Sequence, residues 1–340
     1  MSVGPPGVPD SADTLGVKIK GKTAPLAADE SFDVWGPRVD VPPVTVQRLA
    51  DLPQPPARRR RPWGLGDVAW CFAGLLLSQL VVLIGFVVVA VMRVGPDAAH
   101  DPAGVMEQVM KVSTEATKVG LFLVFALVIQ WFAFVGPTVY AARRKGRGRL
   151  RNTFGFFVRP KRDIALGLGL AAFMQVLLWG VQRLITALGI NTAGSDNTSM
   201  VTDNHGIFLI LMIAGAAVGA PIVEELFFRG LVLGALAKRI AKFDLFAPVG
   251  SPQEPASAKR RKLGVLLSAF ISALLFGGLH MTTDGNGEFH LVGATILMLQ
   301  TGSLGFVFAL VAAKTRRLGV TMCAHIAFNS SSIALVLLTR

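Results

Sequence analysis

Seven apolar stretches dominate this chain, and each is near or above the roughly 20 residues that a helix needs to cross a hydrocarbon core about 30 Å thick. They are predicted at residues 68–92, 119–142, 164–188, 206–228, 263–281, 292–313 and 318–338. Lipid offers no partners for backbone amides, so such segments must be helices or strands of a closed barrel. The stretches are too long and too unalternating for barrel strands. The sequence therefore predicts an all-α, polytopic membrane helix bundle with about seven transmembrane helices.

The composition excludes two other classes of protein. With 52% hydrophobic and 16% charged side chains, the chain is too apolar for a soluble globular protein of 340 residues. The net charge of +13 comes from short basic clusters beside the apolar stretches, and no nucleic-acid recognition motif accompanies it. We therefore expect the lipid bilayer, and no nucleic acid, as a partner. Both cysteines, Cys71 and Cys323, lie in predicted spans, so no disulfide framework is implied.

The basic residues also predict the orientation. Reading alternate connections, one side of the membrane receives 28 Lys and Arg residues and the other receives five. Cytoplasmic connections carry the excess of positive charge in membrane proteins. The N-terminus is therefore predicted in the cytoplasm and the C-terminus outside.

The chain divides into three parts. Residues 1–62 are rich in Pro and Arg, lack an early apolar core, and are predicted to form a disordered cytoplasmic tail. Residues 63–162 hold the first two transmembrane helices, and residues 163–340 hold the remaining five. Between the first two spans, residues 105–118 fit either a short amphipathic helix on the outer surface or a plain solvated loop.

Three charged residues, Glu224, Glu225 and Arg229, interrupt a run that is otherwise apolar from Gly206 to Ala237. Charge at membrane depth is rare and marks either a function or a paired partner. On a helix, Glu225 and Arg229 are four residues apart and share a face, so they can neutralise each other. Glu224 is rotated by about 100° from Glu225 and is left free to accept a proton from water. The alternative is a structural ion-pair cluster between helices.

Two later spans contribute further polar side chains. His280 follows Gly277 and Gly278, which would let another helix or a peptide backbone approach closely. It fits either an interfacial residue or a catalyst. His325 and Asn329 lie four residues apart and can both donate hydrogen bonds toward one point, as a developing oxyanion requires. The pair also fits plain hydrogen bonding between helices.

These three segments together resemble the CPBP family of CAAX proteases and bacteriocin-processing enzymes, also called the Abi family, which includes the Ras-converting CAAX prenyl endopeptidase. The family pattern is Glu-Glu-x-x-x-Arg, then Phe-x-x-x-His, then His-x-x-x-Asn. Its matches in this chain are Glu224, Glu225 and Arg229, then Phe276 and His280, then His325 and Asn329. The resemblance covers roughly residues 164–338.

The resemblance implies a role for each matched residue. Glu224 would activate water together with His280, and Glu225 with Arg229 would hold the site together, with Phe276 as a further supporting residue. His325 and Asn329 would stabilise the oxyanion. The family is often labelled a metalloprotease, so zinc on Glu224, His280 and His325 is an alternative. The chain lacks the His-Glu-x-x-His helix of zincins, and we therefore expect metal-free chemistry without a required cofactor.

The sequence thus predicts an intramembrane endopeptidase that hydrolyses a peptide bond of a membrane-associated peptide or protein in a bacterial plasma membrane. A CAAX-like peptide, a bacteriocin or another membrane peptide would be the substrate. Two alternatives stay open. Intramembrane Glu, His and Arg also line proton and ion paths, which would make the chain a coupled transporter. The chain could also be a catalytically idle relative that serves as a membrane anchor or immunity protein.

Overall fold

The computed structural model describes residues 63–95, 100–118, 120–192, 206–248, 257–281 and 289–339. Within these ranges every regular element is a helix, and seven helices are long and apolar enough to cross a membrane. The predicted all-α membrane bundle is confirmed. The predicted N-terminal tail, residues 1–62, lies outside the described residues, and the orientation across the membrane stays a prediction.

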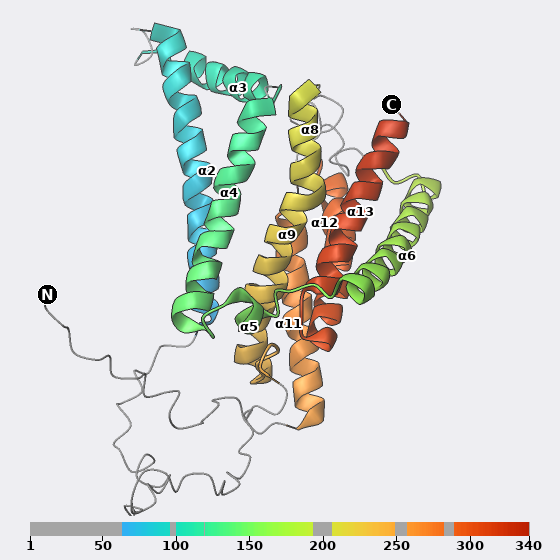
Figure 1. The fold of residues 1–340 in the computed structure, drawn as a ribbon. Helices are drawn as coiled ribbons and strands as arrows, with labels where there is room; N and C mark the ends of the chain where they lie inside the picture. The colour runs from blue at the N-terminus through green and yellow to red at the C-terminus, as the bar shows by residue number, and fades with distance from the viewer. Residues whose placement is uncertain are drawn as a thin grey trace, which may run out of the picture. The chain divides into compact units, whose positions relative to one another are not determined.

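The first two spans are α2 (Leu65–Val94) and α4 (Gly120–Tyr140), and a π-helical turn, η3 (Ala141–Lys145), continues the second. Between them lies α3 (Pro102–Lys118), which packs on both spans and runs across their shared end (Figure 1). The segment is therefore the short helix, not the loop. Val109 and Val112 are buried, whereas Met106 and Met110 are exposed. That division of apolar side chains suits a helix at the membrane surface.

The fourth span is one long helix with alternating α and π segments. It consists of α8 (Gly206–Ala214), η4 (Gly215–Gly219), α9 (Ala220–Glu224), η5 (Glu225–Val232), α10 (Leu233–Leu236) and η6 (Ala237–Ala241). The predicted end at residue 228 is wrong, since the candidate span covers Leu209–Ala241, 33 residues. Such a helix is about 50 Å long and exceeds the hydrocarbon core.

Two buried contacts explain why the helix continues past residue 228. Arg229 is 1% exposed and pairs with Glu225 inside the bundle, so its charge does not require water. At Gly230 a Cβ would lie 3.3 Å from the Phe154 Cβ, so the glycine packs against the short helix α5 (Leu150–Phe154) and stays helical. π-Helical turns insert an extra residue into an α-helix and are frequent at functional sites. Here the turn η5 begins at Glu225.

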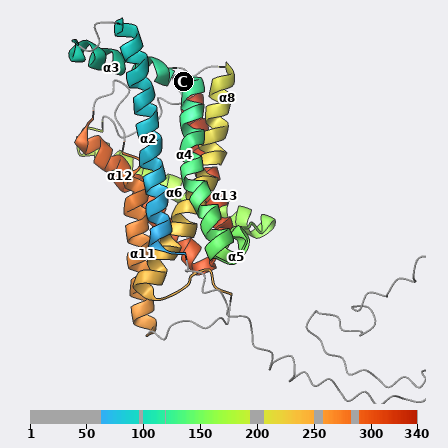
Figure 2. The ribbon, with the colours of Figure 1, turned by 90° about the vertical axis from the view of Figure 1, so that its left-hand side faces the viewer.

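Four spans remain, namely α6 (Pro160–Ala187), α11 (Ala258–Gly278), α12 (Leu291–Thr315) and α13 (Gly319–Leu338). The last three pack on the fourth helix, whereas α6 packs on α13. The most extensive pairings are α11 with α12 and α6 with α13, and α4 packs on α8 (Figure 2). Glycines allow the close approach of α11 to α12 and of α6 to α13. A Cβ at Gly277 would lie 2.4 Å from the Met298 carbonyl oxygen, and one at Gly167 would lie 2.6 Å from the Cys323 Cβ.

Aromatic rings fill the core beside the fourth helix. The Phe134 and Phe227 rings stack with centroids 4.3 Å apart, and the Phe228 ring meets the edge of Phe276 at 5.1 Å. The Ser272 hydroxyl of α11 donates to the Phe228 carbonyl oxygen at 3.1 Å. These contacts hold η5 between α4 and α11. They set the rotation of the helix that carries the three charged residues.

Candidate active site

Glu225 and Arg229 form a fully buried ion pair. Their side chains are 0% and 1% exposed, and Arg229 Nη1 lies 3.2 Å from Glu225 Oε1. This confirms the predicted pairing of the two charges. The Arg229 guanidinium also lies over two ring faces, 4.3 Å from the Phe276 centroid and 5.6 Å from that of Phe308. Attraction between a cation and a ring adds to the stabilisation of a desolvated guanidinium.

A glycine of α12 makes room for this packing. A Cβ at Gly305 would lie 2.8 Å from Phe276 Cδ1 and 3.3 Å from Arg229 Nη2. Any larger residue would have to displace the ring or the guanidinium. Gly305 and Phe308 therefore belong to the site, although the sequence analysis assigned no residue of the sixth span to it. Their signal in the sequence is a small residue and an aromatic one three positions apart, which is common in any membrane helix.

His325 of α13 lies between the two glutamates. Its Nδ1 is 3.1 Å from Glu225 Oε1, and its Nε2 is 3.6 Å from Glu224 Oε2. The first is a hydrogen bond in which the imidazole donates to the carboxylate. The second is longer than a normal hydrogen bond. The ring is held at its edges by Phe276 and Phe308, with centroids 5.9 and 5.6 Å away.

Glu224 differs from its neighbours in exposure. Its side chain is 20% exposed, whereas those of Glu225 and Arg229 are buried almost completely. The predicted rotation between the two glutamates thus has a structural consequence. Both carboxylates reach the same imidazole, but only the Glu224 carboxylate keeps access to the surroundings of the helix.

His280 lies just beyond the C-terminal end of α11. Its Nδ1 is 2.7 Å from the Phe276 carbonyl oxygen, and its ring is 4.5 Å from the Phe276 ring. A carbonyl oxygen only accepts, so Nδ1 donates in this contact and Nε2 takes no part in it. No ion pair or hydrogen bond joins His280 to Glu224, both of which lie in the described part of the chain. Their shared action on water stays a prediction.

The Phe276 ring connects the parts of this constellation. It contacts the Arg229 guanidinium and both His280 and His325. The structure thus brings residues of the fourth, fifth and seventh spans to one ring. From the sequence, Phe276 was predicted only as a supporting motif residue. The position of its ring between the cation and the two imidazoles follows from tertiary packing.

Asn329 lies one turn beyond His325 and contacts the backbone of the fourth helix. Its Nδ2 donates to the Ala216 carbonyl oxygen at 2.9 Å, within the π-helical turn η4. The contact is hydrogen bonding between helices, as in the alternative interpretation of this residue. A π-helical turn disturbs the regular hydrogen-bond ladder, and here a carboxamide satisfies one of its carbonyls. The oxyanion role of Asn329 stays a prediction.

The zinc alternative requires Glu224, His280 and His325 around one ion. Among the described residues, no group of three or more His, Cys, Asp or Glu side chains is arranged to hold a metal ion. Glu224 and His325 lie near each other, and His280 Nδ1 donates to a backbone carbonyl, a bond that metal-ligating histidines also make. Metal-free chemistry stays a prediction.

A second buried ion pair was missed by the sequence analysis. Asp163 at the start of α6 pairs with Arg317, which precedes α13, and both side chains are buried. A Cβ at Gly319 would clash with this Asp163 carboxylate, so the first turn of α13 is shaped around the pair. The partners are 154 positions apart in the chain, and no local spacing relates them.

Comparison with known proteins supports the motif assignment. Residues 206–331 match the family described as Type II CAAX prenyl endopeptidase Rce1-like. The chain is also 25% identical over 164 residues to the "Putative membrane peptidase YdiL" of Bacillus subtilis (strain 168), a match that covers 48% of this chain and 51% of that protein. The chain thus aligns with about half the length of this relative. No solved structure matches the chain. The resemblance predicted from the three motifs is confirmed, and the matched segment contains all of them.

Proposed function

We propose that this chain is an intramembrane endopeptidase of the CPBP type. It would hydrolyse a peptide bond of a membrane-associated peptide or protein with water activated by Glu224 and His280. The observation that carries the proposal is the different exposure of the two adjacent carboxylates. Glu225 is buried and paired, whereas Glu224 meets the same imidazole and keeps access to its surroundings. An enzyme that hydrolyses amides needs one reachable base and a rigid group that positions it.

In this mechanism the buried pair positions the reacting groups. Glu225 accepts from His325 Nδ1 and thereby fixes the imidazole ring. Arg229 compensates the Glu225 charge and is itself held by the rings of Phe276 and Phe308. Such groups are already oriented before the reaction occurs, so no free energy is spent on reorienting them in the transition state.

Glu224 would take the proton of a water molecule that attacks the scissile carbonyl. His280 would orient the same water molecule through Nε2, because its Nδ1 proton is donated to the Phe276 carbonyl oxygen. The resulting oxyanion would accept a hydrogen bond from Asn329, and one from His325 Nε2 when both ring nitrogens carry protons, since Nδ1 already donates to Glu225. Asn329 would then exchange its bond to the Ala216 carbonyl for one to the substrate. Catalytic hydrogen bonds often form fully only when substrate is present. As the tetrahedral intermediate collapses, the C–N bond would break and Glu224 would return its proton to the leaving nitrogen.

The test uses purified full-length protein in detergent and a set of hydrophobic and C-terminally lipidated reporter peptides, with products identified by mass spectrometry. We expect Glu224→Gln and His280→Ala each to lower the cleavage rate by about 10²-fold or more, as loss of a general base does. The matched control is Glu107→Gln, which removes an exposed carboxylate from α3. Circular dichroism and gel filtration would show that the variants fold. Parental cleavage rates in both site variants would disprove the assignment.

A further inference from the structure

A pocket of about 370 Å³ lies away from the candidate active site, at the end of the bundle that the positive-inside rule assigns to the cytoplasm. Three segments outside the family motifs form it. They are the connection between η3 and α6, the segment that follows η6, and the turn between α12 and α13. Its lining includes Arg147, Arg151 and Arg316, together with Phe157 and Phe246, and the described residues that line it include no carboxylate.

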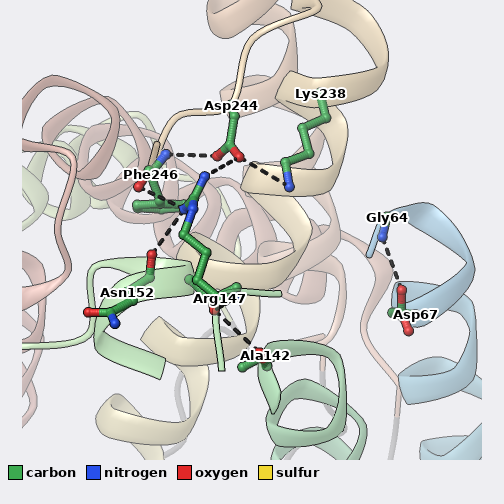
Figure 3. Close-up of polar contacts among 9 residues, drawn as sticks. Gly64, Asp67, Ala142, Arg147, Asn152, Lys238, Asp244 and Phe246 are labelled. Carbon is green, nitrogen blue, oxygen red and sulfur yellow. Dashed lines mark hydrogen bonds and ion pairs between the residues drawn. The ribbon is translucent and has the colours of Figure 1, made fainter. Parts of the chain in front are cut away.

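Arg147 is held rigidly in the wall of this pocket (Figure 3). Its Nη1 donates to the carbonyl oxygens of Asn152 and Phe246, each at 3.0 Å, and its Nη2 pairs with Asp244 at 2.7 Å. Asp244 also faces the ammonium of Lys238 at 3.4 Å. One carboxylate that is not part of the pocket lining is therefore shared by at least two cations. The pocket is an open recess lined by three arginines.

The backbone of Arg316 points to a role for its side chain. Arg316 ends α12 with φ of 55°, and its amide bonds the Ala312 carbonyl oxygen at 2.8 Å. Glycine is the favoured residue in this left-handed position, and other side chains there carry a cost. Lys242 ends η6 with φ of 53° in the same way, but it does not line the pocket. A cation at a helix C-terminus is favourable by itself, so Lys242 serves as the matched control.

We propose that this arginine pocket binds a phosphate group, and that the phosphate belongs to the headgroup of an anionic phospholipid. Arginine guanidinium groups recognise phosphate oxygens through paired charge-assisted hydrogen bonds. Basic pockets at the cytoplasmic ends of membrane helices are suited to anionic headgroups. The neighbouring α6 exposes Ile164 and Leu168 in its first turns, and these two side chains share a helix face that offers an apolar surface for the acyl chains. A free phosphate would use the same guanidinium groups without the apolar surface.

The experiment measures thermal unfolding of the full-length protein in a neutral detergent, titrated separately with phosphatidylglycerol, phosphatidylcholine and inorganic phosphate. For the parent, phosphatidylglycerol is expected to raise the unfolding temperature, because it binds three chain segments together. Phosphatidylcholine and inorganic phosphate are expected to leave the unfolding temperature unchanged. Arg316→Gly is expected to fold at least as stably as the parent without lipid, since glycine suits the backbone. Its apparent affinity for phosphatidylglycerol falls by about tenfold or more, whereas Lys242→Gly keeps the parental affinity.

Arg151→Gln provides a second variant that leaves the helix end of α12 unchanged, and it is expected to lose affinity as Arg316→Gly does. Equal losses in Lys242→Gly and Arg316→Gly would overturn the proposal, since they would reflect net charge alone. Parental affinity in both Arg316→Gly and Arg151→Gln would overturn it as well. If inorganic phosphate protects the parent as strongly as phosphatidylglycerol, and Arg316→Gly removes both effects, the phosphate site stands and the lipid source is refuted.

Discussion

The buried ion pair of Glu225 and Arg229 allows a quantitative test of the site. Arg229→Met removes the guanidinium, keeps most of the apolar volume, and leaves the Glu225 carboxylate buried without its cation. At the observed separation of 3.2 Å, an effective dielectric constant of about 20 gives an attraction of about 5 kcal/mol. Breaking a buried pair by removing one partner typically costs about 3–5 kcal/mol. We expect Arg229→Met to lower the free energy of unfolding by about 3–5 kcal/mol.

The second arm of the test removes both charges. Glu225→Gln alone should cost at least about 2 kcal/mol, because Arg229 then lacks its buried partner and His325 loses a charged acceptor. The double variant Glu225→Gln with Arg229→Met should cost less than Arg229→Met alone, since no uncompensated charge of this pair remains. The free energies come from denaturant unfolding in detergent micelles, followed by far-ultraviolet circular dichroism and extrapolated linearly.

Arg144→Met is the matched control, because it makes the same substitution at an exposed position in η3 and should cost no more than about 0.5 kcal/mol. Two results would refute the reasoning. The first is a cost below about 1 kcal/mol for both single variants. The second is a double variant whose cost equals the sum of the two single costs, since the charges would then not compensate each other.

Three further predictions concern packing and cofactor use. Gly305→Ala should lower the cleavage rate by about 10-fold to 100-fold, because the new methyl displaces the Phe276 ring that contacts both histidines. The control is Gly302→Ala, whose methyl makes only an ordinary van der Waals contact and which should cleave normally. Gly167→Ala should lower the free energy of unfolding by about 1–3 kcal/mol, because the new methyl separates α6 from α13. The control is Gly169→Ala, whose methyl contacts no neighbouring atom and should not destabilise the protein. A chelator added to the cleavage assay should leave the rate unchanged, and a loss restored by zinc would contradict the metal-free mechanism.

The spans were predictable because hydrophobic length is a property of the local sequence. Six of the seven predicted spans agree with the helices to within a few residues at each end. The fourth failed at its C-terminal end, which was predicted at residue 228, directly before Arg229. The helix continues because the charge is neutralised by a residue one turn earlier, and a hydropathy pattern does not register such compensation.

The catalytic candidates were predictable as a set but not as contacts. The spacing of Glu225 and Arg229 indicated their pairing, because residues four apart on a helix are always neighbours. No spacing indicated that His325 lies between both glutamates, or that Asn329 bonds a carbonyl of the fourth helix 113 positions away. Those contacts depend on how far each helix is rotated about its axis and on which glycines let neighbours approach.

The sequence by itself determined a seven-span helical membrane protein, the identity of its charged and polar motif residues, and the salt bridge within one helix. These features depend on transfer of apolar side chains into lipid and on helical periodicity, and both act over short stretches of chain. Only the tertiary structure decided that one carboxylate is buried and its neighbour partly exposed, that the Phe276 ring contacts a cation and two imidazoles, and that three arginines line one pocket. The physical reason is that burial and distance between helices arise from packing among segments far apart in the chain.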